Sequence, residues 1–417
     1  MIFVTLVAPK LLTLGIKKNN SFVLLSFFRN FTAMKILHTS DWHLGHVLYH
    51  YDREEEQTAF LLQLEQIVRR EQPDALLVSG DVFHTPAPSA ATVKMYVSAM
   101  LALRSACPTM AIVVIAGNHD SASRIDCDRD LWRVAGITVV GTVARGADDA
   151  VARHIIPVHD AGRQLLGTIV AVPHCYRLPA DTFFADLLAM ADRSRPVVLM
   201  AHLTMTGSDI TGHDNIGMLD SVPPARVAGY DYVALGHIHR PQFIAGGDRR
   251  VRYCGTPVAV SFDEQCEHSV SLVTLNGHDA PQVRTIAIGN VRPLLTIPAS
   301  EPLPFSQALQ QLEASTDRRP CYIRLNVLAD DPLPVDAHAR AARVAQAHGY
   351  RFCTMRVTSP QRNEREQFAL SAQQLQALSP VDVAQRYVSG RLGRDLTERE
   401  RQMLHFVLKQ IDEEDHA

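Results

Sequence analysis

Residues 34–45 read MKILHTSDWHLG, an apolar run followed at once by a polar turn that carries Asp41 and His43. The same pattern recurs at 75–84 (ALLVSGDVFH) and at 111–120 (AIVVIAGNHD). Each run is short and rich in β-branched or aliphatic residues, and each ends in a turn that contains glycine, as buried strands commonly do. The three segments therefore predict three strands, each with a polar turn at its C-terminal end.

Between these strands the apolar residues change to helical spacing, at Glu54 to Arg70 and at Ala90 to Leu103. Alternation of strand and helix predicts an α/β fold, with sheets covered by helices. Further strands are expected at Gly167 to Val172, Pro196 to Ala201 and Tyr232 to Leu235. His237 and His239 follow the last of these strands and are two residues apart, so an extended chain would point both imidazoles to one side. From Arg252 to Ile288 the pattern becomes antiparallel, because the runs SVSLVTL and QVRTIAI are separated by Asn276-Gly277.

The order of these elements predicts three regions after residue 33. Residues 34–289 form the largest domain, and residues 290–360 read as strand, helix, strand, helix, strand, a small α+β domain. Residues 361–417 have helical character, with Thr397 and Glu400 spaced as a capping box. An apolar stripe follows on that last helix, at Met403, Leu404, Val407, Leu408 and Ile411. This stripe packs either on its own domain or on a partner protein.

Residues 1–33 are apolar and basic, and their character changes abruptly at Met34. No uninterrupted apolar run reaches the roughly 18 residues that span a bilayer, and Phe31-Thr32-Ala33 is a poor signal-peptidase site. We expect translation to begin at Met34, with residues 1–33 a non-native or disordered extension. The seven cysteines include no CxxC pair, so reduced thiols and a cytoplasmic protein without membrane contact are expected.

The polar residues at the strand ends form one candidate site. In an α/β sheet the C-terminal ends of parallel strands share an edge, so distant turns deliver side chains into one crevice. Oxygen and imidazole donors without thiolate suit manganese, iron or zinc better than calcium, and a bridging Asp81 would hold two ions roughly 3.5–4 Å apart. Such a centre hydrolyses phosphoesters. The seven candidate ligands are Asp41, His43, Asp81, Asn118, His202, His237 and His239.

The motifs DWH, GDVFH, GNHD and GHIH, in this order with a lone histidine before the last, resemble those of the calcineurin-like metallophosphoesterase superfamily. Within it, TSDWHLG, IAGNHDSASR, ALGHIH and YCGTPVAVSFDE are similar to the SbcD family, the nuclease subunits of bacterial SbcCD complexes. The resemblance extends from Met34 to the C-terminus. It implies a β-sandwich flanked by helices, a capping domain at 290–360, and C-terminal helices at 361–417 that bind an SbcC-type ATPase.

The same resemblance implies a role for each site residue. Two manganese ions are expected, with Mg²⁺ or another divalent ion as the alternative. One ion would be held by Asp41, His43, Asp81 and His239, and the other by Asp81, Asn118, His202 and His237. His119 would donate a proton to the departing sugar oxygen or position the scissile phosphate, and His84 would lie close to it. His46 stands where relatives commonly have arginine or lysine. The histidines that match no ligand position are His50, His159, His174 and His213.

The function implied is a manganese-dependent DNA nuclease of end processing, recombination and repair, a 3′–5′ double-strand exonuclease and a single-strand or hairpin endonuclease. A homodimer within a heterotetramer or larger complex is expected. A net charge of −3 leaves DNA contact to local basic patches and metal ions. The alternatives are a phosphodiesterase of small molecules and a non-catalytic DNA-end scaffold. A protein phosphatase is disfavoured, because GDVFHTP lacks the phosphate-binding arginine of those enzymes.

Overall fold

The computed structural model describes residues 13–18, 21–26, 33–144, 151–211, 221–329 and 332–359, together with several residues between 382 and 403. The chain forms two compact units. The first comprises Met1–Thr296, Asp317–Arg324 and Ala345–Cys353. The second comprises Ile297–Thr316, Leu325–Val344 and Thr354–Ala417. The predicted boundary between residues 289 and 290 stays a prediction.

The first unit contains two six-stranded sheets. One has the order β16-β15-β3-β6-β7-β8. Its central strands run parallel from β3 to β8, and β15 pairs antiparallel with both β3 and β16. The antiparallel pattern predicted near the end of the domain is therefore confirmed. The strands are β3 (Met34–Thr39), β6 (Ala75–Ser79), β7 (Ala111–Ile115), β8 (Ile137–Val140), β15 (Ser269–Leu275) and β16 (Gln282–Ala287).

The other sheet has the order β13-β14-β12-β11-β10-β9. Strands β10, β11, β12 and β14 are parallel, and the two edge strands pair antiparallel with their neighbours. The strands are β9 (Ile155–His159), β10 (Leu165–Val172), β11 (Val197–His202), β12 (Tyr232–Gly236), β13 (Gln242–Phe243) and β14 (Val251–Tyr253). In both sheets, therefore, the central strands are parallel, and turns follow their C-terminal ends.

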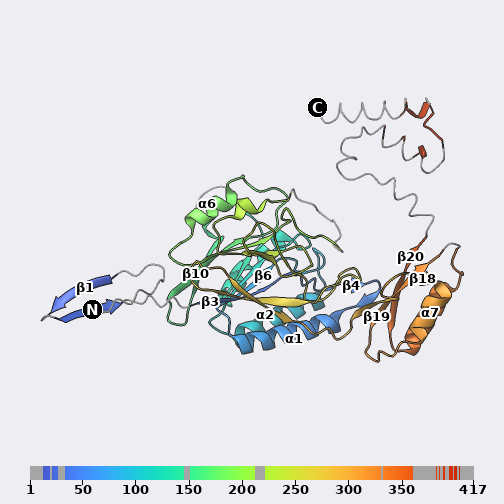
Figure 1. The fold of residues 1–417 in the computed structure, drawn as a ribbon, viewed down its shortest axis with the longest axis horizontal. Coiled ribbons are helices and arrows are strands. Elements are labelled where there is room, and N and C mark those ends of the chain that lie inside the picture. The colour runs from blue at the N-terminus through green and yellow to red at the C-terminus, as the bar shows by residue number, and fades with distance from the viewer. Residues whose placement is uncertain are drawn as a thin grey trace. The chain divides into compact units, whose positions relative to one another are not determined.

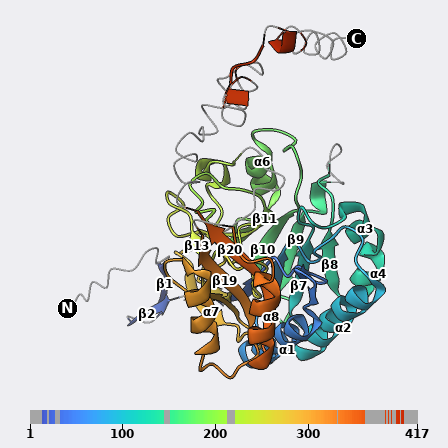
Figure 2. The ribbon, with the colours of Figure 1, turned by 90° about the vertical axis from the view of Figure 1, so that its right-hand side faces the viewer.

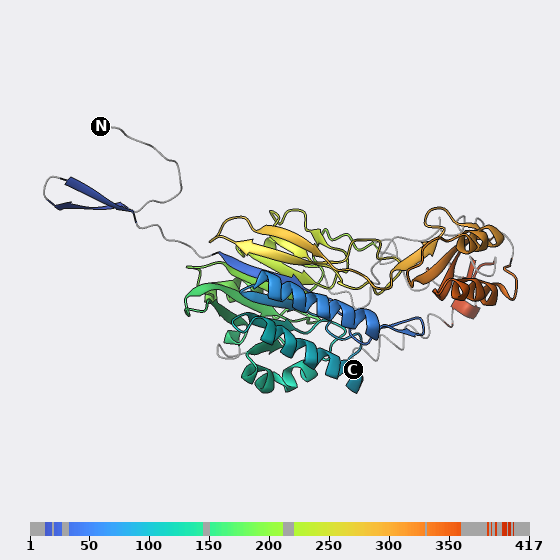
Figure 3. The same ribbon diagram turned by 90° about the horizontal axis from the view of Figure 1, so that it is seen from below.

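The two sheets pack face to face, because alternate residues of each strand point to opposite sides. Ile36 and Leu77 join a core with Ile169 and Met200 of the other sheet, and all four are fully buried. Helices α1 (Glu54–Glu71) and α2 (Ala90–Ala106) cover the outer face of the first sheet, and α6 (Phe183–Met190) covers that of the second. Figures 1 and 2 show α6 opposite α1 and α2, and Figure 3 shows α1 beside α2. The predicted sandwich flanked by helices is confirmed.

Local sequence explains the two long helices. Ser89 caps α2 by accepting a hydrogen bond from the Thr92 N–H at 3.1 Å. Helix α1 has three glutamates in its first turn and two arginines in its last, charges that complement the helix dipole. The short elements α3 (Ala122–Cys127), α4 (Arg129–Val134), η1 (Pro224–Val227), β4 (Val47–Leu48) and β5 (Tyr51–Asp52) were not expected from the sequence.

Strands and helices alternate after residue 290, as predicted. A four-stranded sheet has the order β17-β19-β18, with β20 beside β19. The elements are β17 (Leu294–Ile297), β18 (Leu303–Pro304), α7 (Phe305–Glu313), β19 (Tyr322–Leu328), α8 (Ala337–Ala347) and β20 (Arg351–Thr358). Among the described residues, none of the helices is long and apolar enough to cross a membrane.

The two ends of the chain are described only in part. Near the N-terminus, β1 (Thr13–Lys18) and β2 (Ser21–Ser26) form an antiparallel pair, and the expectation that residues 1–33 are non-native stays a prediction. Near the C-terminus the capping box is confirmed: the Thr397 N–H donates to Glu400 Oε2 at 2.8 Å, and the Glu400 N–H donates to Thr397 Oγ1 at 3.4 Å. The remainder of the predicted stripe, Leu404, Val407, Leu408 and Ile411, lies outside the described residues.

Candidate metal centre

The seven predicted ligand residues meet at one end of the sandwich. They come from the turns that follow β3, β6, β7 and β12, and from the last residue of β11. Asp41, His43, Asp81 and His202 are each at most 1% exposed. Because a buried charge is costly unless it is paired or binds a metal, this burial indicates a specific site. The crevice is bordered by both sheets of the sandwich, not by the single sheet edge expected from the sequence.

Four of the seven residues have backbone conformations that L-residues rarely adopt. The φ angles are 54° at Asp41, 45° at His43, 51° at Asp81 and 101° at His237. Such conformations persist only where the surroundings enforce them, and they concentrate at functional sites. The turns are joined by backbone hydrogen bonds, from Asp41 N–H to Gly80 O at 2.9 Å and from His43 N–H to Asp81 O at 3.0 Å.

The positive φ at His237 corrects one expectation. We expected an extended backbone from His237 to His239, with both imidazoles on one side because they are two residues apart. The chain instead turns at His237, which is why the two rings reach different partners: His237 reaches Asn118, and His239 reaches His43.

Glycine is required where the turns meet. A Cβ atom on Gly117 would lie 2.0 Å from Asp81 Oδ1, and one on Gly236 would lie 1.9 Å from the Ser79 carbonyl oxygen. Both distances are impossible for a real side chain. These glycines therefore let neighbouring backbone approach the ligand residues closely, and a substitution at Gly117 would displace Asp81.

One group of donors contains Asp41, His43 and His239, whose candidate ligand atoms all lie within 4.8 Å of one another. The Nε2 atoms of His43 and His239 face each other at 3.2 Å. His239 Nδ1 lies 2.9 Å from Glu264 Oε1, so Nδ1 carries the proton and Nε2 presents its lone pair. Two ring nitrogens that point at one place with their lone pairs suit a shared cation.

A second group surrounds Asn118. Its Oδ1 lies 2.9 Å from His202 Nε2 and 3.0 Å from His237 Nδ1. Asp81 Oδ2 lies between the two groups, 3.5 Å from His202 Nε2 and 3.7 Å from His43 Nε2. The other ring nitrogen of His202, Nδ1, donates to the Ser79 carbonyl oxygen at 2.8 Å, which turns Nε2 toward the site. The arrangement suits two cations that share Asp81.

Buried carboxylates and imidazoles at this centre shift one another's pKa values. Burial lowers the pKa of His43 well below its usual range, so its imidazole is neutral and can bind a metal. Burial alone would raise the pKa of Asp81, but the neighbouring His202, His43 and His119 together outweigh it and hold that pKa well below the usual range. Burial likewise opposes a charge on His202, yet the Asp81 carboxylate raises the pKa of His202 to about 9.

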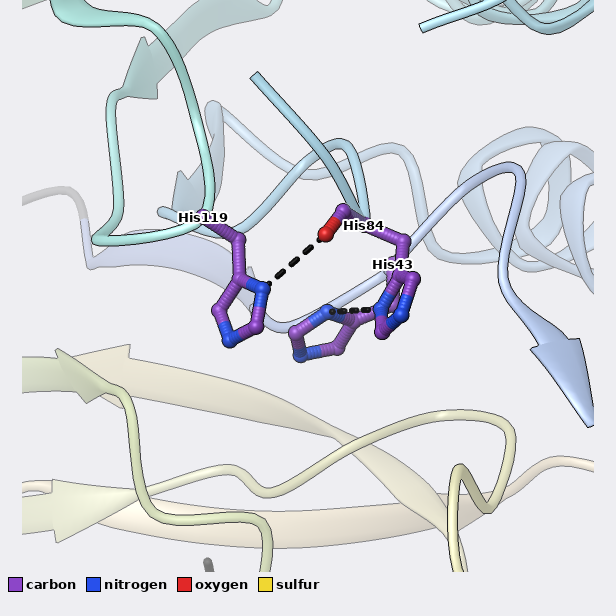
Figure 4. A group of neighbouring side chains, drawn as sticks. All are labelled: His43, His84 and His119. Atoms are coloured by element: carbon purple, nitrogen blue, oxygen red, sulfur yellow. Dashed lines mark hydrogen bonds between the residues drawn. The ribbon is translucent and has the colours of Figure 1, made fainter. Parts of the chain in front are cut away.

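His119 and His84 lie at the edge of the first group (Figure 4). The His119 N–H donates to Asp81 Oδ1 at 2.8 Å, and its Nδ1 lies 3.0 Å from the His84 carbonyl oxygen. His119 therefore carries a proton on Nδ1, and any proton it exchanges with a substrate is on Nε2. His84 Nδ1 lies 3.4 Å from His43 Nδ1, and the His46 ring packs edge-on against His84 with centroids 4.6 Å apart.

Two further carboxylates, without a role predicted from the sequence, support the ligands. Glu264 binds His239 through Oε1 and accepts a hydrogen bond from Thr256 Oγ1 at 2.7 Å through Oε2. Asp120 accepts N–H bonds from Gly117 at 2.9 Å, Val82 at 3.1 Å and Phe83 at 2.8 Å, which fastens two ligand turns together. Glu264 belongs to the motif SFDE and Asp120 to the motif GNHD. Their place in these motifs was the one sequence feature that could have indicated a role.

Of the four histidines without a predicted ligand position, His174 contacts a proposed ligand, because its ring packs edge-on against that of His202. His50 packs against Tyr51, and His159 is exposed on β9. The His174 ring centroid is 6.0 Å from that of His202. His213 lies outside the described residues.

Comparisons with known proteins agree with this geometry. The family model described as "Calcineurin-like phosphoesterase" matches residues 34–241. A protein from Rhodobacter capsulatus, named as the SbcD subunit of the nuclease SbcCD, is 34% identical over 366 residues, covering 79% of this chain and 88% of the relative. Proteins of the same name from Escherichia coli K12 and Bacillus subtilis 168 are 30% and 31% identical, covering 90% and 76% of this chain and 96% and 83% of the relatives.

Proposed function

Because the chain belongs to the SbcD family of calcineurin-like phosphoesterases, which are divalent-metal-dependent phosphodiester hydrolases, we propose that it is a manganese-dependent DNA nuclease. The observation that carries the proposal is the pair of donor groups that share Asp81, with His119 at their edge. A pair of divalent ions that share a carboxylate is a common means of hydrolysing a phosphodiester.

The donor chemistry fits two divalent ions. We assign Asp41, His43, Asp81 and His239 to one ion, and Asp81, Asn118, His202 and His237 to the other. When bound, the ions supply Lewis-acid activation of water and neutralise the charge that develops on the phosphate. Carboxylate, amide and imidazole donors without thiolate suit manganese.

His119 is the proton donor of the proposed reaction. Its Nδ1–H is fixed on the His84 carbonyl oxygen, and its backbone N–H is fixed on Asp81. The ring is therefore oriented before substrate arrives, with Nε2 available to protonate the departing sugar oxygen. His84 contributes through its carbonyl oxygen and through its ring, which lies beside His43 Nδ1. We assign His84 to the site as the residue that orients His119 and His43.

The proposed substrate is DNA. By the activity of its family, the chain would degrade duplex ends from 3′ to 5′ and cut single-stranded and hairpin DNA. The relatives' name places them in a complex, and we propose an SbcC-type ATPase as the partner of this chain, bound through residues 361–417. Residues 290–360 would form the domain that limits DNA access, in a homodimer within a heterotetramer.

The test is the substrate preference of the purified full-length chain with Mn²⁺. We expect cleavage of duplex ends and of hairpin oligonucleotides, and copurification of an ATPase subunit from cells. The variant Asp81→Ala, measured in parallel, controls for contaminating nuclease. Far faster hydrolysis of para-nitrophenyl phosphate esters than of DNA would contradict the proposal and favour an enzyme of small phosphoesters.

A further inference from the structure

A cavity of about 420 Å³ opens directly beside the second donor group. Its volume lies within the range of small-ligand sites. Its wall combines apolar side chains, among them Val172, Leu203 and Val222, with polar and charged ones. His202 also lines it, and His202 Nε2 is 2.9 Å from Asn118 Oδ1. A group bound in this His202 cavity would therefore lie next to the metal centre. The proposed function assigns no ligand to this cavity.

The charged residues of the His202 cavity differ in what they can bind. Arg226 forms an ion pair with Asp181 at 2.7 Å and donates to the carbonyl oxygens of Asp181 and Ala180 at 3.1 and 3.3 Å. The Arg226 guanidinium is therefore already paired with residues 180 and 181. Arg177, by contrast, makes no hydrogen bond or ion pair with any residue in the described ranges. The cavity thus offers one cation to an incoming anion, enough for a single phosphate.

Tyr176 provides an aromatic surface at the same cavity. Its side chain is 80% exposed, which is unusual for so large a ring. The Tyr176 ring packs edge-on against His174, with centroids 5.2 Å apart and an interplanar angle of 82°, and this contact fixes its orientation. A fixed, exposed tyrosine beside a basic side chain is the arrangement that proteins use to stack unpaired bases and hold the adjacent backbone.

We propose that the His202 cavity binds the unpaired base of the nucleotide next to the scissile phosphate, with Tyr176 stacking on the base and Arg177 pairing with a neighbouring backbone phosphate. This inference rests on the proposed nuclease function. A base enters the cavity only when it has left its partner strand, because a paired base is held inside the duplex stack. Cleavage therefore favours single-stranded, hairpin-loop or frayed DNA over fully paired DNA.

Steady-state kinetics of the full-length chain with Mn²⁺ test the proposal. We expect Tyr176→Ala to raise KM for a single-stranded oligonucleotide about tenfold, because one stacked base is lost, and Tyr176→Phe to behave as the parent. Arg177→Ala should weaken the salt dependence of KM, since one phosphate contact is removed. Hydrolysis of bis(para-nitrophenyl) phosphate, which has no base, should be unchanged in all three variants.

The outcomes separate the two proposals. Parent-like KM for DNA in Tyr176→Ala would overturn the cavity assignment and leave the nuclease intact. An equal loss on DNA and on bis(para-nitrophenyl) phosphate would also overturn it, because Tyr176 would then support the centre itself. A parent protein that hydrolyses the small diester but no DNA would overturn the nuclease function.

A binding measurement gives a readout that is independent of turnover. In the His119→Leu background with Mn²⁺, an oligonucleotide carrying 2-aminopurine should lose fluorescence on binding, because the base stacks on Tyr176. Tyr176→Ala in that background should remove the quenching, and Tyr176→Phe should keep it. Quenching that persists in Tyr176→Ala would place the base elsewhere and contradict the proposal.

Discussion

The two sheets of the sandwich supply different chemistry to one centre. The sheet that contains β3, β6 and β7 supplies both carboxylates, the amide and one imidazole, at Asp41, Asp81, Asn118 and His43. The sheet that contains β11 and β12 supplies imidazoles alone, at His202, His237 and His239. All of the formal negative charge among the seven therefore comes from the first sheet, and the second sheet adds imidazole nitrogens, which favour some divalent ions over others.

The two halves are also held differently. On the first sheet, the carboxylates accept backbone N–H bonds: Asp81 from His119 at 2.8 Å, and Asp41 from His237 at 3.0 Å. On the second sheet, His202 and His239 are oriented through their other ring nitrogen, on a carbonyl and on a carboxylate oxygen. Substitution of a carboxylate ligand on the first sheet should therefore abolish ion binding. Substitution of a residue that orients an imidazole of the second sheet should only weaken it.

The largest expected effect is that of Asp81→Ala. Because Asp81 lies between both donor groups, its removal should take both ions from the protein and reduce cleavage to background. Mass spectrometry for manganese per chain measures this. Asp130→Ala is the matched control, since Asp130 lies at the surface in α4. A variant that retained two ions per chain would show that Asp81 is not the shared ligand.

His119→Leu should separate chemistry from ion binding. His119 contacts Asp81 through its backbone N–H, which leucine keeps, so both ions should remain. The rate of cleavage should fall by about 10²- to 10⁴-fold, the usual contribution of a general acid. His159→Leu, a change on the exposed end of β9, is the control. Normal turnover in His119→Leu would remove this residue from the mechanism.

The long elements and the ligand positions could be predicted from the sequence because each follows from local pattern. The run at 34–39 and the turn at Asp41 are adjacent, so periodicity finds the strand and the turn together. Helix α6 was not predicted, because its eight residues, FFADLLAM, are apolar on nearly all sides and show no clear helical period. The short helices α3 and α4 have six residues each, which is too few for a period to appear.

The supporting interactions of the site could not be predicted, because they join residues that no local pattern connects. Glu264 reaches His239 across 25 positions of sequence, and His202 reaches Ser79 across 123. The contact of His202 with Ser79 depends on how the two sheets pack, and the contact of Glu264 with His239 depends on the course of the loop between β14 and β15. The turn at His237 was mispredicted for a related reason: its positive φ is enforced by Asp41, which accepts the His237 N–H from the other sheet.

Glu264→Gln tests the half of the centre that depends on the second sheet. The Glu264 side chain is 4% exposed, and its carboxylate makes His239 a stronger donor. Glutamine keeps an acceptor oxygen but loses the charge, so affinity for one manganese ion should fall about 10- to 100-fold while the other ion stays bound. Isothermal titration with Mn²⁺ measures both sites. Exposed Glu267 gives the control variant, Glu267→Gln. Loss of both ions together would contradict the view that the residues behind the second sheet's imidazoles only tune the affinity for one ion.

The smallest effect is expected from His84→Ala, because the hydrogen bond between His84 and His119 is made by the His84 backbone. The carbonyl oxygen that accepts from His119 Nδ1 remains in the variant. The ring that is removed lies beside His43 Nδ1 and stacks on the His119 ring with centroids 5.5 Å apart. The contact with His43 Nδ1 is long, at 3.4 Å, so cleavage should fall by no more than about tenfold, through weaker binding of the ion at His43. Raising the Mn²⁺ concentration should restore most of the rate, and His84→Asp, which offers a new acceptor to His43, should lose less. A loss as large as that of His119→Leu, unaffected by Mn²⁺, would instead mean that the His84 ring itself takes part in proton transfer or phosphate binding.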